Sequence, residues 1–349
     1  MHNARRVLLT GLLILLCGFA PGASIASFDG ATGWINSPVL HPGDLRGKVV
    51  LVDFWEYTCL NCLRTLPYLR EWYKRYHNDG FTIVGVHTPE FAFSSQTPQI
   101  ESAAKRLGID WPIAVDSNLT IWKRYGINLW PTELLFDQSG RLVDAQYGEG
   151  NYPQTEAKIQ ALLHAADPAL ALPPVMPLLP QDNYDKPGAV CYPHTPEILI
   201  GQTPIADATA FGDPAKDLEY DDSGKHRDGA IYLSGYWHMT RDAAAFGGGR
   251  GYFDLAYHAI EVAVVMTPGS GSSRVIVTQD GKPLAREDAG ADVHYDDAGN
   301  AYIEVDAARA YHVVENAVYG AHDLRLAPAG FGVAFYDVAF ESCEVPGAR

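Results

Sequence analysis

The sequence is short of positive charge, of cysteine and of long apolar runs. Its 26 Lys and Arg residues are outnumbered by 42 Asp and Glu residues, which gives a net charge of −16. Nucleic-acid binding needs a basic face, so this composition excludes nucleic acid as a partner. Beyond the N-terminal stretch, no segment approaches the roughly 18 apolar residues of a membrane-spanning helix. With 47% hydrophobic residues over 349 positions, the chain is long enough for two globular domains.

The first residues have the pattern of a signal peptide. Arg5 and Arg6 form a short basic region, and an apolar stretch over 7–20 follows it. Small residues then occupy the positions that precede a cleavage site, ending at Ala26. The sequence therefore predicts export, with residues 1–26 removed and a soluble mature protein that is periplasmic or otherwise extracytoplasmic.

The chain has five cysteines, and removal of Cys17 with the signal peptide leaves four. An even number in an oxidising compartment favours pairing. The simplest arrangement is one redox-active pair, Cys59 with Cys62, and one structural bridge, Cys191 with Cys343.

Hydrophobic patterning divides the mature chain into three parts. Residues 27–166 alternate strand and helix patterns, which predicts an α/β fold with a mixed sheet. Residues 167–188 are rich in proline and predict an extended, semi-stiff linker. Residues 189–349 carry short apolar segments between turn signals, which predicts an antiparallel β-sandwich. The expected strands are 49–55, 81–86, 132–137 and 142–146 in the first part, with helices at 59–76, 99–107, 119–125 and 156–165; in the last part the expected strands are 197–201, 230–236, 252–257, 261–266, 274–279, 301–305, 310–314, 320–326 and 332–340.

Cys59 and Cys62 lie between a buried strand and a helix. A helix N-terminus stabilises a thiolate, and the two-residue gap lets the second thiol attack a mixed disulfide formed on the first. Asp53 lies inside the preceding apolar strand, where burial would raise its pKa and suit it to proton exchange with a thiol. A strand-end aspartate bonded to backbone is an equally good interpretation of Asp53 alone, and the neighbouring Cys pair favours the catalytic one.

Pro131 directly precedes the strand expected at 132–137. Base rates for X–Pro bonds favour a trans peptide here. In a fold of this kind, however, the same proline would face the Cys pair and leave a free backbone edge for a substrate segment.

These motifs resemble the thioredoxin superfamily, and within it the extracytoplasmic TlpA-like branch. The resemblance is carried by Val52–Trp55, the CxxC pair and Pro131–Phe136. The stretch Trp55–Pro67, with His87–Phe91 and Gly148–Gly150, is similar to the thioredoxin-like portion of DipZ proteins over about residues 30–165.

The resemblance implies a thioredoxin fold with assigned roles for four residues. Cys59 would be the exposed nucleophile, Cys62 the buried resolving thiol, Asp53 its proton acceptor, and Pro131 a cis proline. No cofactor is implied. Thr58 stands where thioredoxin itself has Trp, which puts general thioredoxin-like reactivity in doubt.

Two partners are implied besides client disulfides and thiols. DipZ proteins carry a multi-span membrane domain that this sequence lacks, so a separate membrane electron donor of the CcdA/DsbD type is expected. The C-terminal stretch, through Thr195–Glu197 and Gly320–Leu326, resembles the end of DipZ proteins and implies a jelly-roll, carbohydrate-binding-module-like sandwich with glycan as a further partner.

Other residues admit more than one interpretation. His87, Glu90 and Phe91 suit substrate contact or loop packing about equally, and Glu56 is expected to be solvated. The acidic groups 217–222 and 292–297 lack the spacing of a calcium loop and are interpreted as solvated loops. The aromatic residues of the last part have two interpretations, stacking on sugar rings and packing in the core, and packing is favoured. These residues are Tyr232, Tyr236, Trp237, Tyr252, Tyr257, Tyr302, Tyr311 and Tyr319.

We therefore expect an exported thiol–disulfide oxidoreductase that reduces or exchanges disulfides of extracytoplasmic client proteins. The alternative is a glycan- or cell-surface-binding protein with an accessory thioredoxin fold. A thiol peroxidase ranks low, because no Pro-x-x-x-Thr-x-x-Cys motif precedes Cys59.

Overall fold

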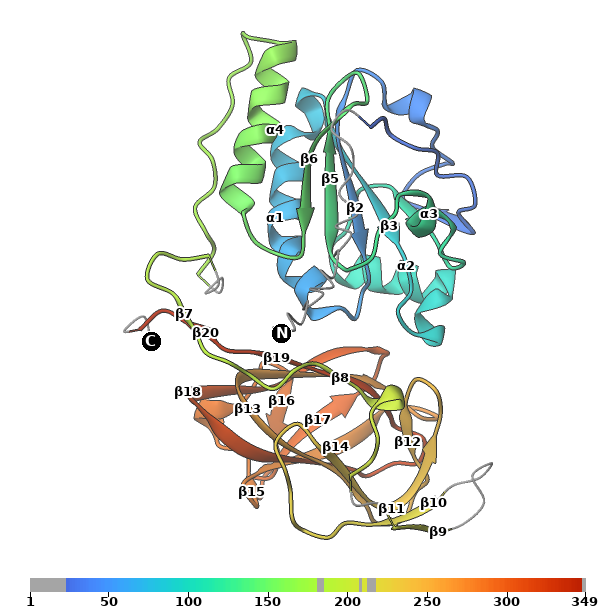
Figure 1. The fold of residues 1–349 in the computed structure, drawn as a ribbon, viewed down its shortest axis with the longest axis vertical. Coiled ribbons are helices and arrows are strands. Elements are labelled where there is room, and N and C mark those ends of the chain that lie inside the picture. Colours follow the sequence, from blue (N-terminus) through green and yellow to red (C-terminus); the bar gives the residue numbers. More distant parts are fainter. Residues whose placement is uncertain (1–22, 181–184, 207–208, 212–217, 347–349) are drawn as a thin grey trace, which may run out of the picture.

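The chain folds into an N-terminal α/β unit and a C-terminal unit of antiparallel strands (Figure 1). The structure is a computed structural model that describes residues 23–180, 185–206, 209–211 and 218–346. Most of the expected signal peptide, including Cys17, lies outside the described residues. No helix within the described ranges is long and apolar enough to cross a membrane. The predicted fold class, a mixed α/β domain followed by antiparallel strands, is confirmed.

The N-terminal unit is built on a six-stranded mixed sheet in the order β1-β4-β3-β2-β5-β6. Strand β2 pairs in parallel with β3 and antiparallel with β5, so it occupies the centre. All seven of its residues are buried, because helices cover both faces of the sheet, and this explains its continuous apolar run. The strands are β1 (Gly33–Ile35), β2 (Val49–Trp55), β3 (Phe81–His87), β4 (Ile113–Val115), β5 (Thr132–Phe136) and β6 (Leu142–Tyr147).

Helices pack on both faces of this sheet. Trp72 of α1, Ile100 of α2 and Ile159 of α4 share one apolar cluster with the sheet. Ile121 of α3 and Phe28 belong to the cluster on the opposite face. The helices are α1 (Leu60–Tyr76), α2 (Thr97–Arg106), α3 (Thr120–Arg124) and α4 (Tyr152–Ala166), and short 3₁₀ turns lie at Pro42–Leu45, His77–Asp79, Ala92–Ser95, Ile200–Gln202 and Arg286–Asp288.

The proline-rich segment that follows α4 lies against the N-terminal unit. The Met176 N–H donates to Glu156 Oε2 at 2.7 Å, and the Leu179 N–H donates to the Tyr68 hydroxyl at 2.8 Å. Met176 is 7% exposed and joins the apolar cluster of α1 and α4. The first half of this segment is therefore docked rather than free.

Two long strands of the C-terminal unit, β13 (Tyr252–Thr267) and β18 (Arg309–Pro328), change pairing partners along their length and contribute to one core. The first half of β13 pairs with β11 and with the second half of β18, as in Ile231↔Leu255 and Phe253↔Leu326. A register shift follows Ala259, and the second half of β13 pairs with β19 and with the first half of β18. Side chains of both halves meet in a single apolar cluster. The strands are β7 (Val190–Cys191), β8 (Ile198–Leu199), β9 (Thr209–Phe211), β10 (Leu218–Asp221), β11 (Ile231–Met239), β12 (Ala244–Phe246), β13 (Tyr252–Thr267), β14 (Ser273–Gln279), β15 (Lys282–Pro283), β16 (Val293–Tyr295), β17 (Ala301–Val305), β18 (Arg309–Pro328), β19 (Ala334–Glu341) and β20 (Cys343–Glu344).

Half of the aromatic residues that are candidates for sugar stacking belong to this core. Tyr232, Trp237, Tyr257 and Tyr311 are at most 1% exposed, which is the packing role. Tyr236 is 46% exposed.

The two ends of the C-terminal unit are joined covalently. Strands β7 and β20 form a small antiparallel pair in which Cys191 lies directly opposite Cys343. The two residues form a disulfide bond across a sequence separation of 152.

Candidate redox site

Cys59 and Cys62 differ in exposure, and the first turn of α1 causes the difference. Cys59 is the N-cap residue of α1, and its Sγ accepts the Cys62 N–H at 3.2 Å. Cys59 is half-buried, whereas Cys62 is 0% exposed. The two form a disulfide bond. A helix N-terminus favours a thiolate, so the reachable sulfur is also the one that the helix stabilises.

Glu56 organises the turn that leads into the pair, and the expectation that it is solvated is wrong. Its side chain is 0% exposed. Oε2 accepts the N–H of Thr58 at 2.5 Å and of Cys59 at 3.1 Å, and it also accepts the Thr58 hydroxyl. The carboxylate is drawn inward because these N–H groups precede the helix and have no helical partner. Burial raises the pKa of Glu56.

His87 ends β3 beside this turn and is fully buried. Its ring lies between Trp55, at 5.2 Å between centroids, and Tyr57, at 5.3 Å. Its Nε2 is 3.7 Å from Glu56 Oε1. Burial lowers the pKa of His87 to about 3, so the imidazole is neutral at physiological pH. These contacts correspond to loop packing, which is one of the two roles expected for His87.

Asp53 is enclosed in β2 and has no hydrogen-bond partner among the described residues. It is 1% exposed, and neither carboxylate oxygen accepts a hydrogen bond. The alternative of an aspartate bonded to backbone therefore does not describe this site. Burial raises the pKa of Asp53 to about 7, where it exchanges a proton readily.

Glu133 lies directly opposite Asp53 on the neighbouring strand, and no sequence motif singled it out. The β2–β5 register places the two residues directly opposite each other, and Glu133 is 4% exposed. Burial, and then the charge of Asp53, raise the pKa of Glu133 well above its ordinary value. A glutamate within the apolar strand Thr132–Phe136 was the available signal, but the register of the hairpin was needed to place it.

Pro131 lies at the same end of the sheet as the cysteine pair. Thr132 pairs with Phe54, which puts Pro131 beside the end of β2 from which the chain runs to Cys59. The Trp130–Pro131 peptide bond is cis. The Pro131 carbonyl accepts the Gly148 N–H at 2.8 Å, and Trp130 packs on Trp122 at 4.4 Å.

Helix α1, which carries the cysteine pair at its start, is tied to the C-terminal unit two residues after Cys62. The Arg64 guanidinium contacts Glu149 at 3.3 Å in the same unit, and Glu261 at 3.0 Å and Glu341 at 3.1 Å across the interface. Leu63 packs with Val265 in an apolar cluster shared by both units. In Figure 1, α1 begins at the end of the N-terminal unit that faces these strands.

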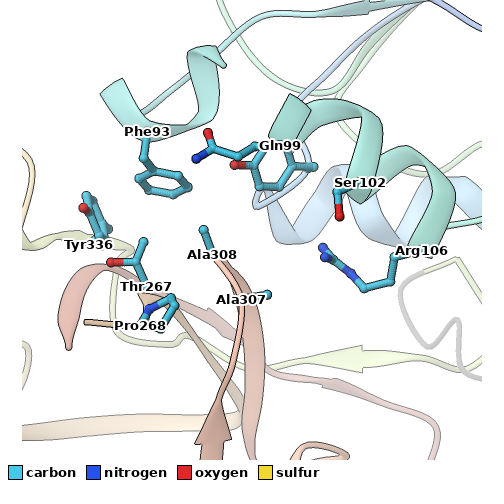
Figure 2. A pocket seen from close by; sticks show the side chains of 10 residues that line it. Phe93, Gln99, Ser102, Arg106, Thr267, Pro268, Ala307, Ala308 and Tyr336 are labelled. Carbon is cyan, nitrogen blue, oxygen red and sulfur yellow. The ribbon is translucent and has the colours of Figure 1, made fainter. Parts of the chain in front are cut away.

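An open cavity of about 370 Å³ lies between the two units (Figure 2). Phe93 and Arg106 line it from the N-terminal unit, and Thr267 and Tyr336 line it from the other. Tyr57, two residues before Cys59, also lines it, and its buried hydroxyl has no partner among the described residues. The C-terminal unit thus supplies one wall of the surface next to the cysteine pair.

Within the described residues, one group of side chains suits a metal ion. Asp222, His226 and Asp254 of the C-terminal unit bring three potential ligand atoms within 4.8 Å of one another. It lies apart from the cysteine pair in the fold.

Both units are similar to known families and proteins. The Redoxin family model matches residues 38–163, and the model of the thioredoxin like C-terminal domain matches residues 195–340. Protein DipZ of Mycobacterium tuberculosis is 35% identical over 283 residues, which cover 76% of this chain and 37% of DipZ. The thiol-disulfide oxidoreductase ResA of Bacillus anthracis is 29% identical over 119 residues, 34% of this chain and 66% of ResA. A solved structure, a putative thiol:disulfide interchange protein DsbE from Chlorobium tepidum, is 23% identical and covers 43% of this chain and 99% of its own, with a TM-score of 0.35.

Over residues 38–163 the chain is similar to the Redoxin family, and this unit has a thioredoxin-like fold with the CxxC pair of thiol–disulfide oxidoreductases. The relatives of the chain are DipZ-like, as the sequence predicted, and the chain spans 37% of the length of the DipZ relatives that it matches.

Proposed function

We propose that the protein is a thiol–disulfide oxidoreductase that reduces or exchanges disulfides of client proteins outside the cytoplasm. The observation that carries the proposal is the unequal pair at the start of α1, a half-buried Cys59 beside a buried Cys62. Such a pair lets a large client reach one sulfur while the other is kept for resolution.

The reducing cycle balances with two electrons and uses four residues. The Cys59 thiolate attacks a client disulfide, forms a mixed disulfide and expels one client thiolate. Cys62 loses its proton to Asp53 and attacks Cys59 Sγ, which releases the second client thiolate and leaves the Cys59–Cys62 disulfide. Asp53 suits this role because its pKa of about 7 lets it accept and return a proton at neutral pH. Pro131, beside the end of β2, positions the client backbone.

The electrons that regenerate the dithiol would come from a membrane donor of the CcdA/DsbD type. This partner, like the extracytoplasmic location, rests on the N-terminal sequence pattern and on the likeness to DipZ, of which this chain matches a part. A glycan partner for the C-terminal unit has weaker support, because four of the eight candidate rings are buried in the core.

The test is the equilibrium reduction potential of the Cys59–Cys62 pair in defined thiol buffers, followed by alkylation and mass analysis. A potential near or below about −220 mV would mark a reductant, and one near about −120 mV an oxidant of client thiols. The matched controls are Cys59→Ser, which should abolish exchange with a model protein disulfide, and a Cys191→Ser/Cys343→Ser double variant, which should retain it. A pair that never titrates, or exchange that survives Cys59→Ser, would overturn the proposal.

A further inference from the structure

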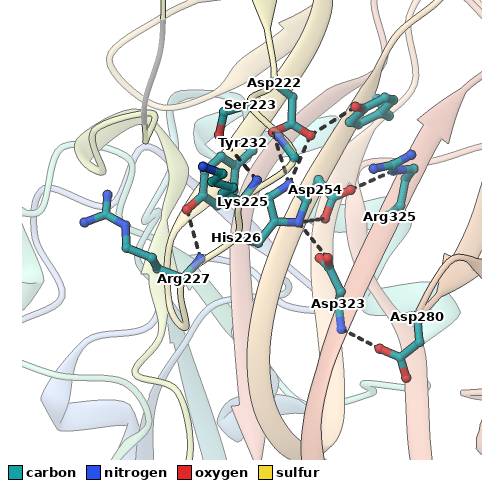
Figure 3. A network of polar contacts seen from close by, with 12 residues as sticks. Asp222, Ser223, Lys225, His226, Arg227, Tyr232, Asp254, Asp280, Asp323 and Arg325 are labelled. Carbon is teal, nitrogen blue, oxygen red and sulfur yellow. Dashed lines mark hydrogen bonds and ion pairs between the residues drawn. The ribbon is translucent and has the colours of Figure 1, made fainter.

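A cluster of polar side chains lies in the C-terminal unit, away from the redox site (Figure 3). We call Asp222, His226, Asp254 and Asp323 the His226 cluster. Asp222 and His226 come from the loop between β10 and β11, Asp254 from β13 and Asp323 from β18. Asp254 and Asp323 are diagonal neighbours in the ladder, because Asp254 pairs with Arg325 and Ala256 pairs with Asp323.

Both ring nitrogens of His226 face carboxylates. Nε2 is 3.1 Å and 3.0 Å from the two oxygens of Asp222. Nδ1 is 2.6 Å from Asp323 Oδ2 and 3.3 Å from Asp254 Oδ1. The two sides of the ring are therefore different: one carboxylate holds Nε2, and two carboxylates converge on Nδ1.

The carboxylates on the Nδ1 side have unused acceptor atoms, and the carboxylate on the Nε2 side does not. Asp222 also accepts the Gly224 N–H at 2.9 Å and the Tyr252 hydroxyl at 3.0 Å. Asp254 is 1% exposed, and its Oδ1 is buried without a hydrogen bond. Asp323 Oδ1 is likewise buried without a hydrogen-bond partner among the described residues.

The His226 cluster carries a net negative charge that one divalent cation would neutralise. Three carboxylates face one permanent cation in contact with them, Arg325, whose Nε donates to Asp254 Oδ2 at 2.6 Å. With a neutral imidazole the sum is −2, and buried charges in proteins are paired or coordinate a metal. A divalent ion balances the cluster by itself, whereas the alternative requires two extra protons.

We propose that the His226 cluster binds one divalent transition-metal ion. His226 Nδ1, Asp254 Oδ1 and an Asp323 oxygen are the ligands, and the open side near Asp323 leaves a position for water. Asp222 is a positioning residue, because it accepts the Nε2–H and thereby presents Nδ1 to the metal. One imidazole with carboxylate oxygens suits Zn²⁺ or Mn²⁺, whereas Ca²⁺ prefers oxygen ligands alone. The ion would fasten the loop before β11 to strands β13 and β18.

Asp222 was expected in a solvated acidic loop, and this expectation is wrong for that residue: its side chain is 1% exposed. Its neighbour Asp217 lies outside the described residues. His226 drew no attention in the sequence because its carboxylate partners are supplied by strands 28 and 97 positions further on.

The test is a titration of the oxidised full chain, stripped with chelator, with Zn²⁺ by calorimetry. Both disulfides stay formed, so that no thiolate competes for the metal. We expect one equivalent to bind and the melting temperature to rise with added Zn²⁺. Asp254→Asn keeps the shape of the side chain and should weaken Zn²⁺ binding at least about 100-fold. Asp222→Asn should weaken it about 10- to 100-fold, the effect expected of a partner that orients a ligand.

The matched control is Asp228→Asn, which removes a different His–Asp contact of the same unit, 2.8 Å from His258. It should bind Zn²⁺ as the unaltered protein does. Circular dichroism and retained disulfide exchange identify any variant that fails to fold, and the visible spectrum of Co²⁺ added to the unaltered chain provides a test without any substitution. The proposal is overturned if the unaltered protein binds neither Zn²⁺ nor Mn²⁺, or if Asp254→Asn binds Zn²⁺ equally well.

Discussion

At the scale of single residues, the carboxyl groups of the redox site belong to buried side chains that do not contact solvent. Asp53 and Glu133 face each other across β2 and β5, and burial raises the pKa of both. Two like charges directly opposite in a ladder repel each other. The pair therefore holds at least one proton near neutral pH, which suits it to pass a proton to or from Cys62.

Substitution of Asp53 tests this role in the proposed cycle. Asp53→Asn should slow the resolving step about 100-fold at pH 7, because a general acid–base group is removed. It should also remove the inflection near pH 7 from the rate profile, since that inflection reports the Asp53 pKa of about 7. Single-turnover kinetics from pH 5 to 9 measure both effects. The exposed Asp110, changed to Asn, should leave the profile intact, and an unchanged inflection in Asp53→Asn would assign it to another group.

The sequence indicates candidate reactive residues, but it does not indicate which side chains surround them. Cys59, Cys62, Asp53 and Pro131 are candidates because their residue types and spacing suit thiol–disulfide chemistry. Glu56 and Glu133 could not be placed, because charge alone predicts exposure and only the turn and the strand register show what encloses them.

At the scale of elements, two features fix the first turns of α1. One is its N-cap at Cys59, and the other is the contact of Arg64 with the C-terminal unit. Arg64 is 23% exposed, and its three carboxylate partners are between 15% and 28% exposed. This is more enclosed than an ordinary surface ion pair, so its loss leaves three acidic side chains close together.

Arg64→Gln should therefore destabilise the protein by roughly 2–3 kcal/mol, below the full cost of a buried ion pair because the groups are partly exposed. Urea unfolding at pH 7 measures the change. Lys74→Gln on the same helix is the control, since Lys74 is 77% exposed and should change stability by less than about 0.5 kcal/mol. Equal effects of the two substitutions would contradict a special role for Arg64.

Element boundaries followed from the sequence where turn or cap signals exist. The helix expected at 59–76 is α1, Leu60–Tyr76, with Cys59 as its cap. In the C-terminal unit, segments 252–257 and 261–266 were expected as two strands and are the single strand β13. A bulge bends this strand without any Gly or Pro turn, so hydrophobic alternation alone reads it as two. Segments 310–314 and 320–326 likewise form the single strand β18, and here Gly320 lies at the irregularity in the pairing with β13.

At the scale of the whole molecule, the Cys191–Cys343 disulfide closes a loop that contains the entire C-terminal unit. In the chain-entropy model a loop of this length contributes about 5 kcal/mol, against about 2 kcal/mol for the short Cys59–Cys62 loop. The double variant Cys191→Ser/Cys343→Ser should therefore lose more stability than Cys59→Ser/Cys62→Ser. Urea unfolding of both variants makes the comparison, and a larger loss in the second would contradict the expectation.

Stability should fall as pH rises from about 4 to about 8. Burial raises the pKa of Asp53 to about 7 and of Glu90 to about 8, and it raises the pKa of Asp337 at the domain interface. The unfolded chain releases these protons near pH 4, so over this range it binds fewer protons than the folded state and the stability gained from protonation is lost.

Urea midpoints of the oxidised protein at pH 5 and pH 8 measure this trend. Asp53→Asn should flatten it and stabilise the protein at pH 8 by up to about 4 kcal/mol. A urea midpoint that is higher at pH 8 than at pH 5 would contradict this prediction, because it would mean that ionisation of these carboxyl groups does not destabilise the folded state.

The docked proline-rich segment limits how far the two units can ever separate. It contacts the N-terminal unit as late as Asp185, whose Oδ2 accepts the Asn151 N–H at 2.5 Å, and the disulfide-bonded pair of strands begins the other unit at Val190–Cys191. The chain from Asp185 to Val190 spans at most about 18 Å when fully extended. Rupture of the Arg64 contacts would therefore leave each unit tethered close to the other, at an effective concentration in the millimolar range. Reassembly of the wall beside Cys59 would be a first-order process that does not depend on dilution.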